Sequence, residues 1–416
     1  MPKHDKSDRK DRNRDSEKDV KKDGWHRLDD AEMNGNIYKG KRGDDSFTGG
    51  DGDDTMIGSA GNDTFSGGAG IDTADYSRLK TAISVKSGGV VDKGELGTDI
   101  LGGFDVPSGQ LEIIEVTIGA EGQRNLVDAT SVVGAVNINI DLMSGQSTYT
   151  VFVPTGGFEV GDSFTKTLVN FIDVNGTNND DTILGSDDDN VFGGSTGHDV
   201  YDGRGGEDTL DYAGLGGAVT LLAGGEIDKG ALGKDRIEGM ETILGDAGQA
   251  NTIDARVDGP QTTSLVADLN AGRLTIEGVP GVDALGFGVV NFVNVIGTDN
   301  ADVIAGDMAD NRIAGVGGSD QLSGGGGDDG FVFDGGDAGI DTISDFDDGD
   351  VLVLETGFGA FTGDALTFTD LFDADSVGTE IVNGADTISS DVMMDGVMVE
   401  FNGSAFAVLT GEFIAG

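Results

Sequence analysis

The stretch GGDGDDTMI, residues 49–57, places three glycines and three aspartates ahead of a short apolar tail. A related stretch, GSAGNDTFS, follows directly at residues 58–66. Glycine allows backbone conformations that other residues avoid, so the first six residues of each stretch predict a tight turn. The last three predict a very short strand whose middle residue points inward. This nine-residue unit decides the fold because it recurs along the chain.

Twelve such units form three blocks, at residues 40–75, 176–211 and 297–332. Position 1 is glycine in all twelve, position 6 is Asp in ten and Asn in two, and position 8 is large and apolar in eleven. A fixed short period predicts a solenoid. If two units make one turn, each strand stacks on the strand two units later, so we expect Phe47 against Phe65 and Met56 against Ala74.

The segments between the blocks are related to each other. VDKGELGTD (91–99) matches IDKGALGKD (227–235), and GQRNLVDA (122–129) matches GQANTIDA (248–255). They contain short β-type segments and no sustained helical period. We therefore predict an all-β fold of parallel β-roll or β-solenoid blocks joined by degenerate solenoid-like spacers. The predicted divisions are a disordered charged tail (1–34), block 1 (35–76), spacer 1 (77–175), block 2 (176–212), spacer 2 (213–296), block 3 (297–346) and a C-terminal β cap (347–416).

The charge of the chain is strongly negative. The sequence has 76 acidic and 26 basic residues, and 13 of the basic residues lie in residues 1–42. Mutual repulsion of this size opposes compaction unless something neutralises it, and it argues against nucleic acid as a partner. The chain has no cysteine and no apolar run long enough to cross a membrane, so we expect neither disulfides nor a membrane span.

The repeated unit has the chemistry of a metal site. Glycines let backbone carbonyls converge, and position 6 adds a carboxylate, so the oxygens suit Ca²⁺. Zinc or copper would favour His or Cys ligands, and the chain has three His and no Cys. The apolar core is one residue deep per strand, so we expect several bound Ca²⁺ ions to contribute to folding. The predicted metal ligands are Asp45, Asp54, Asp63, Asp72, Asp181, Asn190, Asp199, Asp208, Asp302, Asn311, Asp320, Asp329 and Asp341.

Some units depart from this pattern. Ala309 stands at position 4, where glycine is usual, and Asn190 and Asn311 keep an oxygen at position 6 but lose the charge. We expect calcium binding to be weak or absent around Ala309 and Asn311. Lys41 and Arg42 lie among the ligands of the first unit, which favours an end cap over a full site.

The twelve units resemble the RTX (repeats-in-toxin) nonapeptide G-G-x-G-x-D-x-U-x, the hemolysin-type calcium-binding repeat. This resemblance implies a calcium-bound parallel β-roll and export by type I secretion machinery through an uncleaved C-terminal signal. The N-terminus lacks the apolar core of a secretory signal peptide. The C-terminal stretch MVEFNGSAFAVLTGEFIAG (398–416) is similar to the secretion region of type I substrates. A terminal β cap without an export role is the alternative.

Catalytic candidates are few. GGSTG (193–197) fits G-x-S-x-G, with Ser195 as nominal nucleophile and His198 nearby. The glycines already belong to the repeat, and the strand-turn-helix context of that motif is missing, so we predict no catalytic residue. Tyr76 and Tyr212 recur after the first two blocks, and we attribute them to strand packing.

The sequence therefore predicts a secreted, extracellular or surface-bound, non-enzymatic calcium-binding protein that folds on binding extracellular Ca²⁺. Its role would be structural, in a surface layer, a matrix or adhesion, with self-association at the cell surface or in the matrix. Two alternatives are open: an exoenzyme or toxin with a cryptic active site in the spacers, and a calcium-dependent ligand-binding module.

Overall fold

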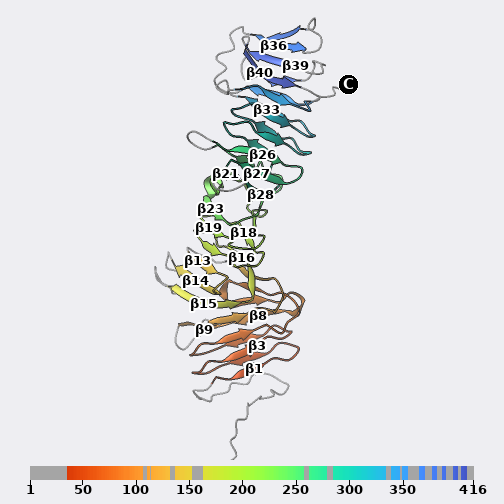
Figure 1. The fold of residues 1–416 in the computed structure, drawn as a ribbon. Coiled ribbons are helices and arrows are strands. Elements are labelled where there is room, and N and C mark those ends of the chain that lie inside the picture. The colour runs from red at the N-terminus through yellow and green to blue at the C-terminus, as the bar shows by residue number, and fades with distance from the viewer. Residues whose placement is uncertain are drawn as a thin grey trace, which may run out of the picture. The chain divides into compact units, whose positions relative to one another are not determined.

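The computed structural model describes residues 35–416 except 106–109, 113, 132–135, 152–162, 257–261, 279–283, 334–338, 347–348, 355–364, 371–376, 382–386, 390–396, 402–403 and 410–416. The predicted disordered tail, residues 1–34, lies outside this part. The chain forms two compact units (Figure 1). The first runs to Val127 and includes Thr165–Phe171, and the second comprises Asp128–Phe164 and Ile172 onward.

The strands of the repeat blocks are three residues long, except for the four-residue β33 (Gly330–Phe333), and bury the residue at position 8. In β3 (Thr55–Ile57) the buried residue is Met56, and in β4 (Thr64–Ser66) it is Phe65. Successive side chains of a strand point to opposite faces, so position 8 of each unit enters the core while positions 7 and 9 stay nearer the surface. Glycine-rich turns separate the strands, which confirms the predicted division of each unit into turn and strand.

The first unit contains two sheets of stacked strands. The parallel register pairs Phe47 with Phe65 and Met56 with Ala74, as predicted. One sheet contains β1 (Ile37–Lys39), β3, β5 (Thr73–Asp75), β11 (Val116–Ile118) and β15 (Ser163–Val169). The other contains β2 (Ser46–Thr48), β4, β8 (Thr98–Leu101), β7 (Val90–Asp92), β6 (Ser84–Lys86) and β12 (Asn125–Asp128). A separate antiparallel pair joins β9 (Gly103–Asp105) to β10 (Gln110–Glu112).

The second unit repeats this arrangement over more turns (Figure 1). One sheet contains β14 (Gln146–Val151), β13 (Val136–Asp141), β17 (Thr182–Leu184), β19 (Val200–Asp202), β23 (Lys234–Glu238), β22 (Glu226–Asp228), β21 (Thr220–Leu222), β25 (Thr252–Asp254), β29 (Asn294–Ile296), β31 (Arg312–Ala314), β33 (Gly330–Phe333), β35 (Val351–Leu354) and β38 (Thr387–Ser389). The other contains β16 (Phe171–Asn175), β18 (Val191–Gly193), β20 (Thr209–Asp211), β24 (Thr242–Leu244), β28 (Ala284–Val290), β27 (Arg273–Glu277), β26 (Ser264–Asp268), β30 (Val303–Ala305), β32 (Gln321–Ser323), β34 (Asp341–Ile343), β40 (Ser404–Leu409), β39 (Val397–Phe401), β36 (Ala365–Asp370) and β37 (Val377–Ile381).

The spacers continue the solenoid, a point that the sequence left open. In the first unit β8 pairs in parallel with β4. In the second, β23 pairs in parallel with β19 and β24 pairs in parallel with β20. Antiparallel hairpins such as β6–β7 and β26–β27 are added to these turns. A spacer is therefore a run of irregular solenoid turns with hairpins inserted.

Helical structure within the described ranges is limited to three 3-10 turns, η1 (Ser87–Gly89), η2 (Gly94–Leu96) and η3 (Gly230–Leu232). Two of them, η2 and η3, occupy matching places in the two spacers, directly ahead of β8 and β23. They hold two lysines that become important below.

Candidate metal-binding loops

The predicted ligands lie where each turn enters its strand. Asp45 in the first unit of block 1 is only partly buried, in agreement with an end cap. The other twelve are buried: Asp54, Asp63, Asp72, Asp181, Asn190, Asp199, Asp208, Asp302, Asn311, Asp320, Asp329 and Asp341. Burying so many ionisable groups is costly unless each one is hydrogen-bonded or paired with a cation.

These side chains form ladders along the two edges of the solenoid. The backbone N–H of Asp54 donates to Oδ1 of Asp72 (2.8 Å), and that of Asp181 donates to Oδ1 of Asp199 (2.9 Å). The spacing of 18 residues is one solenoid turn, so each carboxylate binds the backbone of the loop before it. The position 6 side chains thus form one buried row along each edge.

The ladders extend beyond the repeats. Five acidic residues that the sequence analysis did not single out accept the next hydrogen bond in line: Asp99, Glu115, Asp235, Glu241 and Asp350. Two of them, Asp99 and Asp235, lie in stretches that keep part of the repeat pattern. GELGTDIL (94–101) and GALGKDRI (230–237) keep glycine at positions 1 and 4, Asp at position 6 and an apolar residue at position 8. For the glutamates the sequence carries no comparable pattern.

Several loops also close on their own carboxylate. The backbone N–H of Gly50 donates to Oδ2 of Asp54 at 2.7 Å. A Cβ at Gly49 would overlap that carboxylate, and a Cβ at Gly297 would overlap the carboxylate of Asp302. In these loops position 1 is glycine because a side chain there would overlap the position 6 carboxylate, whereas at Gly58 and Gly194 it would overlap the rings of Tyr76 and Tyr212.

The electrostatics of the ladders call for a cation. Burial raises the pKa of Asp181, Asp199 and Asp208 to about 6. Burial also raises the pKa of Asp320, to about 8, and the nearby carboxylates of Asp341 and Asp302 add to this shift. Two buried oxygens, Oδ2 of Asp208 and Oδ2 of Asp320, accept no hydrogen bond. A bound divalent cation would offset both the desolvation and the repulsion, so the residues present fit a metal.

Within the described residues, no three acidic or histidine side chains gather around one point. Each loop contributes one position 6 side chain, so a cation between two loops would take its remaining ligands from backbone carbonyls. Oxygen-only coordination with several carbonyls is what Ca²⁺ accepts. The position 6 side chains of successive loops are the residues that would hold it.

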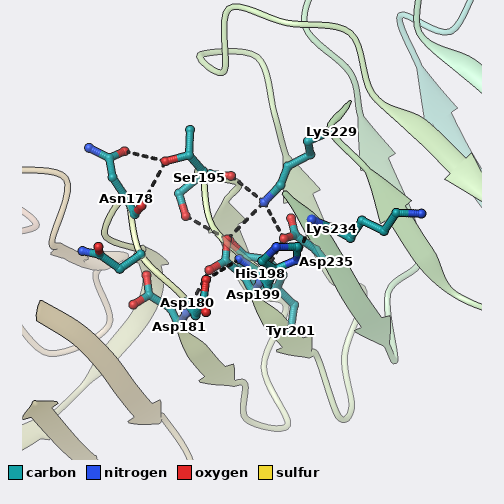
Figure 2. A network of polar contacts seen from close by, with 12 residues as sticks. Asn178, Asp180, Asp181, Ser195, His198, Asp199, Tyr201, Lys229, Lys234 and Asp235 are labelled. Atoms are coloured by element: carbon teal, nitrogen blue, oxygen red, sulfur yellow. Dashed lines mark hydrogen bonds and ion pairs between the residues drawn. The ribbon is translucent and has the colours of Figure 1, made fainter. Parts of the chain in front are cut away.

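A lysine already lies in such a position in the second unit (Figure 2). The Nζ of Lys229 donates to the backbone O of Ser195 (2.7 Å), to Oδ2 of Asp199 (3.3 Å) and to Oδ1 of Asp235. The lysine side chain is fully buried, as are both carboxylates. An ammonium therefore bridges the carboxylates of two successive loops.

The same arrangement occurs in the first unit. The Nζ of Lys93 donates to the backbone O of Ser59 (2.8 Å), to that of Gly61 (3.0 Å) and to Oδ1 of Asp99. Oδ2 of Asp63 lies 3.5 Å from the same nitrogen. The lysine side chain again has no exposed surface. The two spacers thus carry equivalent buried lysines.

Two tyrosines complete these clusters. The hydroxyl of Tyr76 donates to Oδ2 of Asp99 at 3.0 Å, and that of Tyr212 donates to Oδ2 of Asp235 at 2.6 Å. Burial, followed by the neighbouring carboxylates, raises the pKa of both phenols well above the usual value. Attributing these tyrosines to strand packing was therefore incomplete, because each one holds the second carboxylate of its cluster.

The loops that depart from the repeat pattern, at Asn190, Asn311 and Ala309, make other contacts or adopt another backbone conformation. Nδ2 of Asn190 donates to the backbone O of Ile172 (2.8 Å), and Nδ2 of Asn311 donates to that of Val293 (3.1 Å). The amide thus supplies an N–H where a carboxylate cannot. Ala309 is not among the residues with positive φ, so its loop adopts a backbone that alanine tolerates. The weak calcium binding expected there stays a prediction.

The G-x-S-x-G candidate has no nucleophile–base geometry. The hydroxyl of Ser195 donates to Oδ2 of Asp199 at 3.0 Å. Nδ1 of His198 accepts the backbone N–H of Lys234 at 3.1 Å. Both groups are engaged in holding the loop (Figure 2).

Comparison with known families gives one match. The model of the RTX calcium-binding nonapeptide repeat, which comprises four copies, matches residues 39–74, 175–210 and 296–331. These ranges coincide with the three blocks within one residue. No curated protein matches the chain. None of the helices in the described residues is long and apolar enough to cross a membrane.

Proposed function

Three blocks of this chain match the RTX calcium-binding nonapeptide repeat, and from that premise we propose that the chain is secreted and folds on binding extracellular Ca²⁺. The observation that carries the proposal is the pair of carboxylate ladders, in which buried oxygens of Asp208 and Asp320 accept no hydrogen bond. Each ion that binds only the folded chain stabilises it by about 2.7 kcal/mol when free calcium is a hundredfold above the dissociation constant. Several sites together would decide whether the chain is folded.

We propose a structural role for the folded protein, in a surface layer, a matrix or adhesion, where copies of the chain would associate. Three observations support a non-enzymatic role. The two spacers, where a cryptic active site would have to lie, contain no histidine. Their related sequences favour a duplicated structural element over a catalytic centre. Ser195 and His198, the nearest approach to a catalytic pair, are both bound within the loop.

Far-UV circular dichroism tests calcium-dependent folding. We expect the full chain in EDTA to lack most of its β signal and to regain it cooperatively at about 10⁻⁴ to 10⁻³ M CaCl₂, the range of extracellular calcium modules. The matched titration uses MgCl₂, because Mg²⁺ demands a smaller octahedral site and releases its water reluctantly. Equal recovery with magnesium would show that the loops are not calcium sites.

Export needs a separate test. We propose that the segment after residue 350 directs type I secretion, so a chain ending at residue 350 should remain inside cells that carry the secretion machinery. Because type I substrates would cross unfolded, loss of β strands by truncation does not explain a failure of export. The reciprocal chain, a reporter protein carrying residues 351–416, should appear in the medium. Export of the truncated chain at the level of the full chain would refute this part of the proposal.

A further inference from the structure

Two places in the solenoid already contain a cation that is part of the chain. We propose that Lys93 and Lys229 are tethered substitutes for calcium, so that the gap between loops that each ammonium fills closes without the metal. This inference rests on the calcium binding proposed above. It divides the gaps between successive loops into two kinds, one occupied by the chain itself and one available to an ion.

The first argument is the donor set. Around Lys229, every acceptor within hydrogen-bond distance of Nζ is an oxygen: the backbone O of Ser195, Oδ2 of Asp199 and Oδ1 of Asp235 (Figure 2). The two carboxylates come from successive turns at the position 6 register. A cation shared by two loops would meet carbonyl and carboxylate oxygens of this kind. The ammonium and a calcium ion would therefore compete for one position.

The second argument is that the 3-10 turn fixes the backbone of the lysine beside the loop. The backbone N–H of Lys229 donates to the backbone O of Gly233 (2.9 Å) across the 3-10 turn η3. Gly233 has φ of 117°, and a Cβ there would overlap the backbone O of Gly197 in the preceding loop. In the first unit Lys93 and Gly97 make the same bond at 2.9 Å, and Gly97 has φ of 105°. Both copies thus hold the lysine backbone against the loop it serves.

The third argument is the contrast with block 3. There the backbone N–H of Asp320 donates to Oδ1 of Asp341 (3.0 Å), which is the same step of the ladder as Asp199 to Asp235. The chain has no Lys or Arg after Arg312. Oδ2 of Asp320 is buried and accepts no hydrogen bond, whereas Oδ2 of Asp199 accepts bonds from Ser195 and Lys229. At this step of the ladder, the position 6 carboxylate that meets no lysine is the one that keeps an oxygen for an ion.

The decisive experiment measures calcium stoichiometry. The full chain and its Lys229→Ala variant are compared by equilibrium dialysis with ⁴⁵Ca at saturating calcium. We expect the variant to bind one more ion per chain, because the ammonium no longer fills the gap. The control is Lys234→Ala, at the start of β23 and directly after the same 3-10 turn. The ammonium of Lys234 pairs with Asp228 at the surface, so its removal should leave the stoichiometry unchanged. A folded Lys229→Ala variant with unchanged stoichiometry overturns the proposal.

A second measurement uses the unaltered chain, in case the variant does not fold. Lysines of the calcium-saturated protein are acetylated under limiting reagent, and the rate at each lysine is followed by mass spectrometry. Lys93 and Lys229 should react at least ~10-fold more slowly than Lys234, because reaction requires local opening of the loop. If calcium displaced the ammonium, both lysines would lie in solvent and react at the rate of Lys234. That result would overturn the proposal without any variant.

The two proposals fail in different ways. A chain that binds no calcium at all refutes the proposed function. A chain that binds calcium while Lys93 and Lys229 are labelled freely, or while Lys229→Ala gains no ion, refutes only the substitution by lysine.

Discussion

At the scale of single residues, the buried carboxylates of the loops differ in how many of their oxygens accept a hydrogen bond. Both oxygens of Asp235 are bound. Its Oδ1 accepts the N–H of Asp199 and the ammonium of Lys229, and its Oδ2 accepts the hydroxyl of Tyr212. Asp208 differs, because its Oδ2 accepts no hydrogen bond. We infer that the loop of Asp235 is closed without a metal, whereas Asp208 keeps an oxygen for an ion.

Removing one of the donors at Asp235 tests this view. Tyr212→Phe leaves Oδ2 buried without its hydroxyl partner, so we expect the free energy of unfolding in saturating calcium to fall by about 1–3 kcal/mol. Urea denaturation monitored by circular dichroism measures the change. The matched control is Tyr38→Phe, which removes the same hydroxyl from an exposed hydrogen bond to the backbone O of Thr48 and should cost well under 1 kcal/mol. Equal effects of the two substitutions would show that the buried bond to Asp235 adds nothing.

At the scale of elements, the nine-residue period predicted strands, turns and register. Position 8 enters the core and units stack two apart, so Phe47 meets Phe65 without any knowledge of the spacers. The spacers were harder to predict because their hairpins interrupt the period. The contact of Lys93 with Asp63 joins residues 30 positions apart. It depends on how η2 folds back, which periodicity does not describe.

The matching spacers also contain two buried asparagines, Asn125 and Asn251, at equivalent positions of the related stretches 122–129 and 248–255. Their role could not be predicted from the sequence. Oδ1 of Asn251 accepts the N–H of Val219, and its Nδ2 donates to the backbone O of Asn291. Asn125 makes the corresponding bonds to Ile83 and Asn170 in the first unit. An amide supplies donors and an acceptor at once, so these turns need no ion. In the spacers, polar side chains thus satisfy loops that resemble metal sites in the blocks.

At the scale of the whole molecule, net charge and the ladders make different demands. The formal charge of −50 repels over long distances, and any salt can screen it. The buried oxygens of Asp208 and Asp320 are a short-range problem, because each one needs a proton or a cation that fits between the loops. If long-range repulsion limits folding, the protein should respond to ionic strength. If the buried oxygens limit folding, it should respond to calcium itself.

High salt without calcium separates the two demands. In EDTA with 1 M NaCl the screening length falls to about 3 Å, so distant carboxylates no longer repel while the gaps between loops stay unfilled. We expect the hydrodynamic radius of the full chain to shrink while its far-UV circular dichroism stays that of an unfolded chain, and the β signal to appear only when CaCl₂ is added. The control is the same salt step in the presence of calcium, which should leave the β signal unchanged. If 1 M NaCl alone restored the β signal, charge repulsion would be the barrier to folding, and the buried carboxylates would need no ion between them.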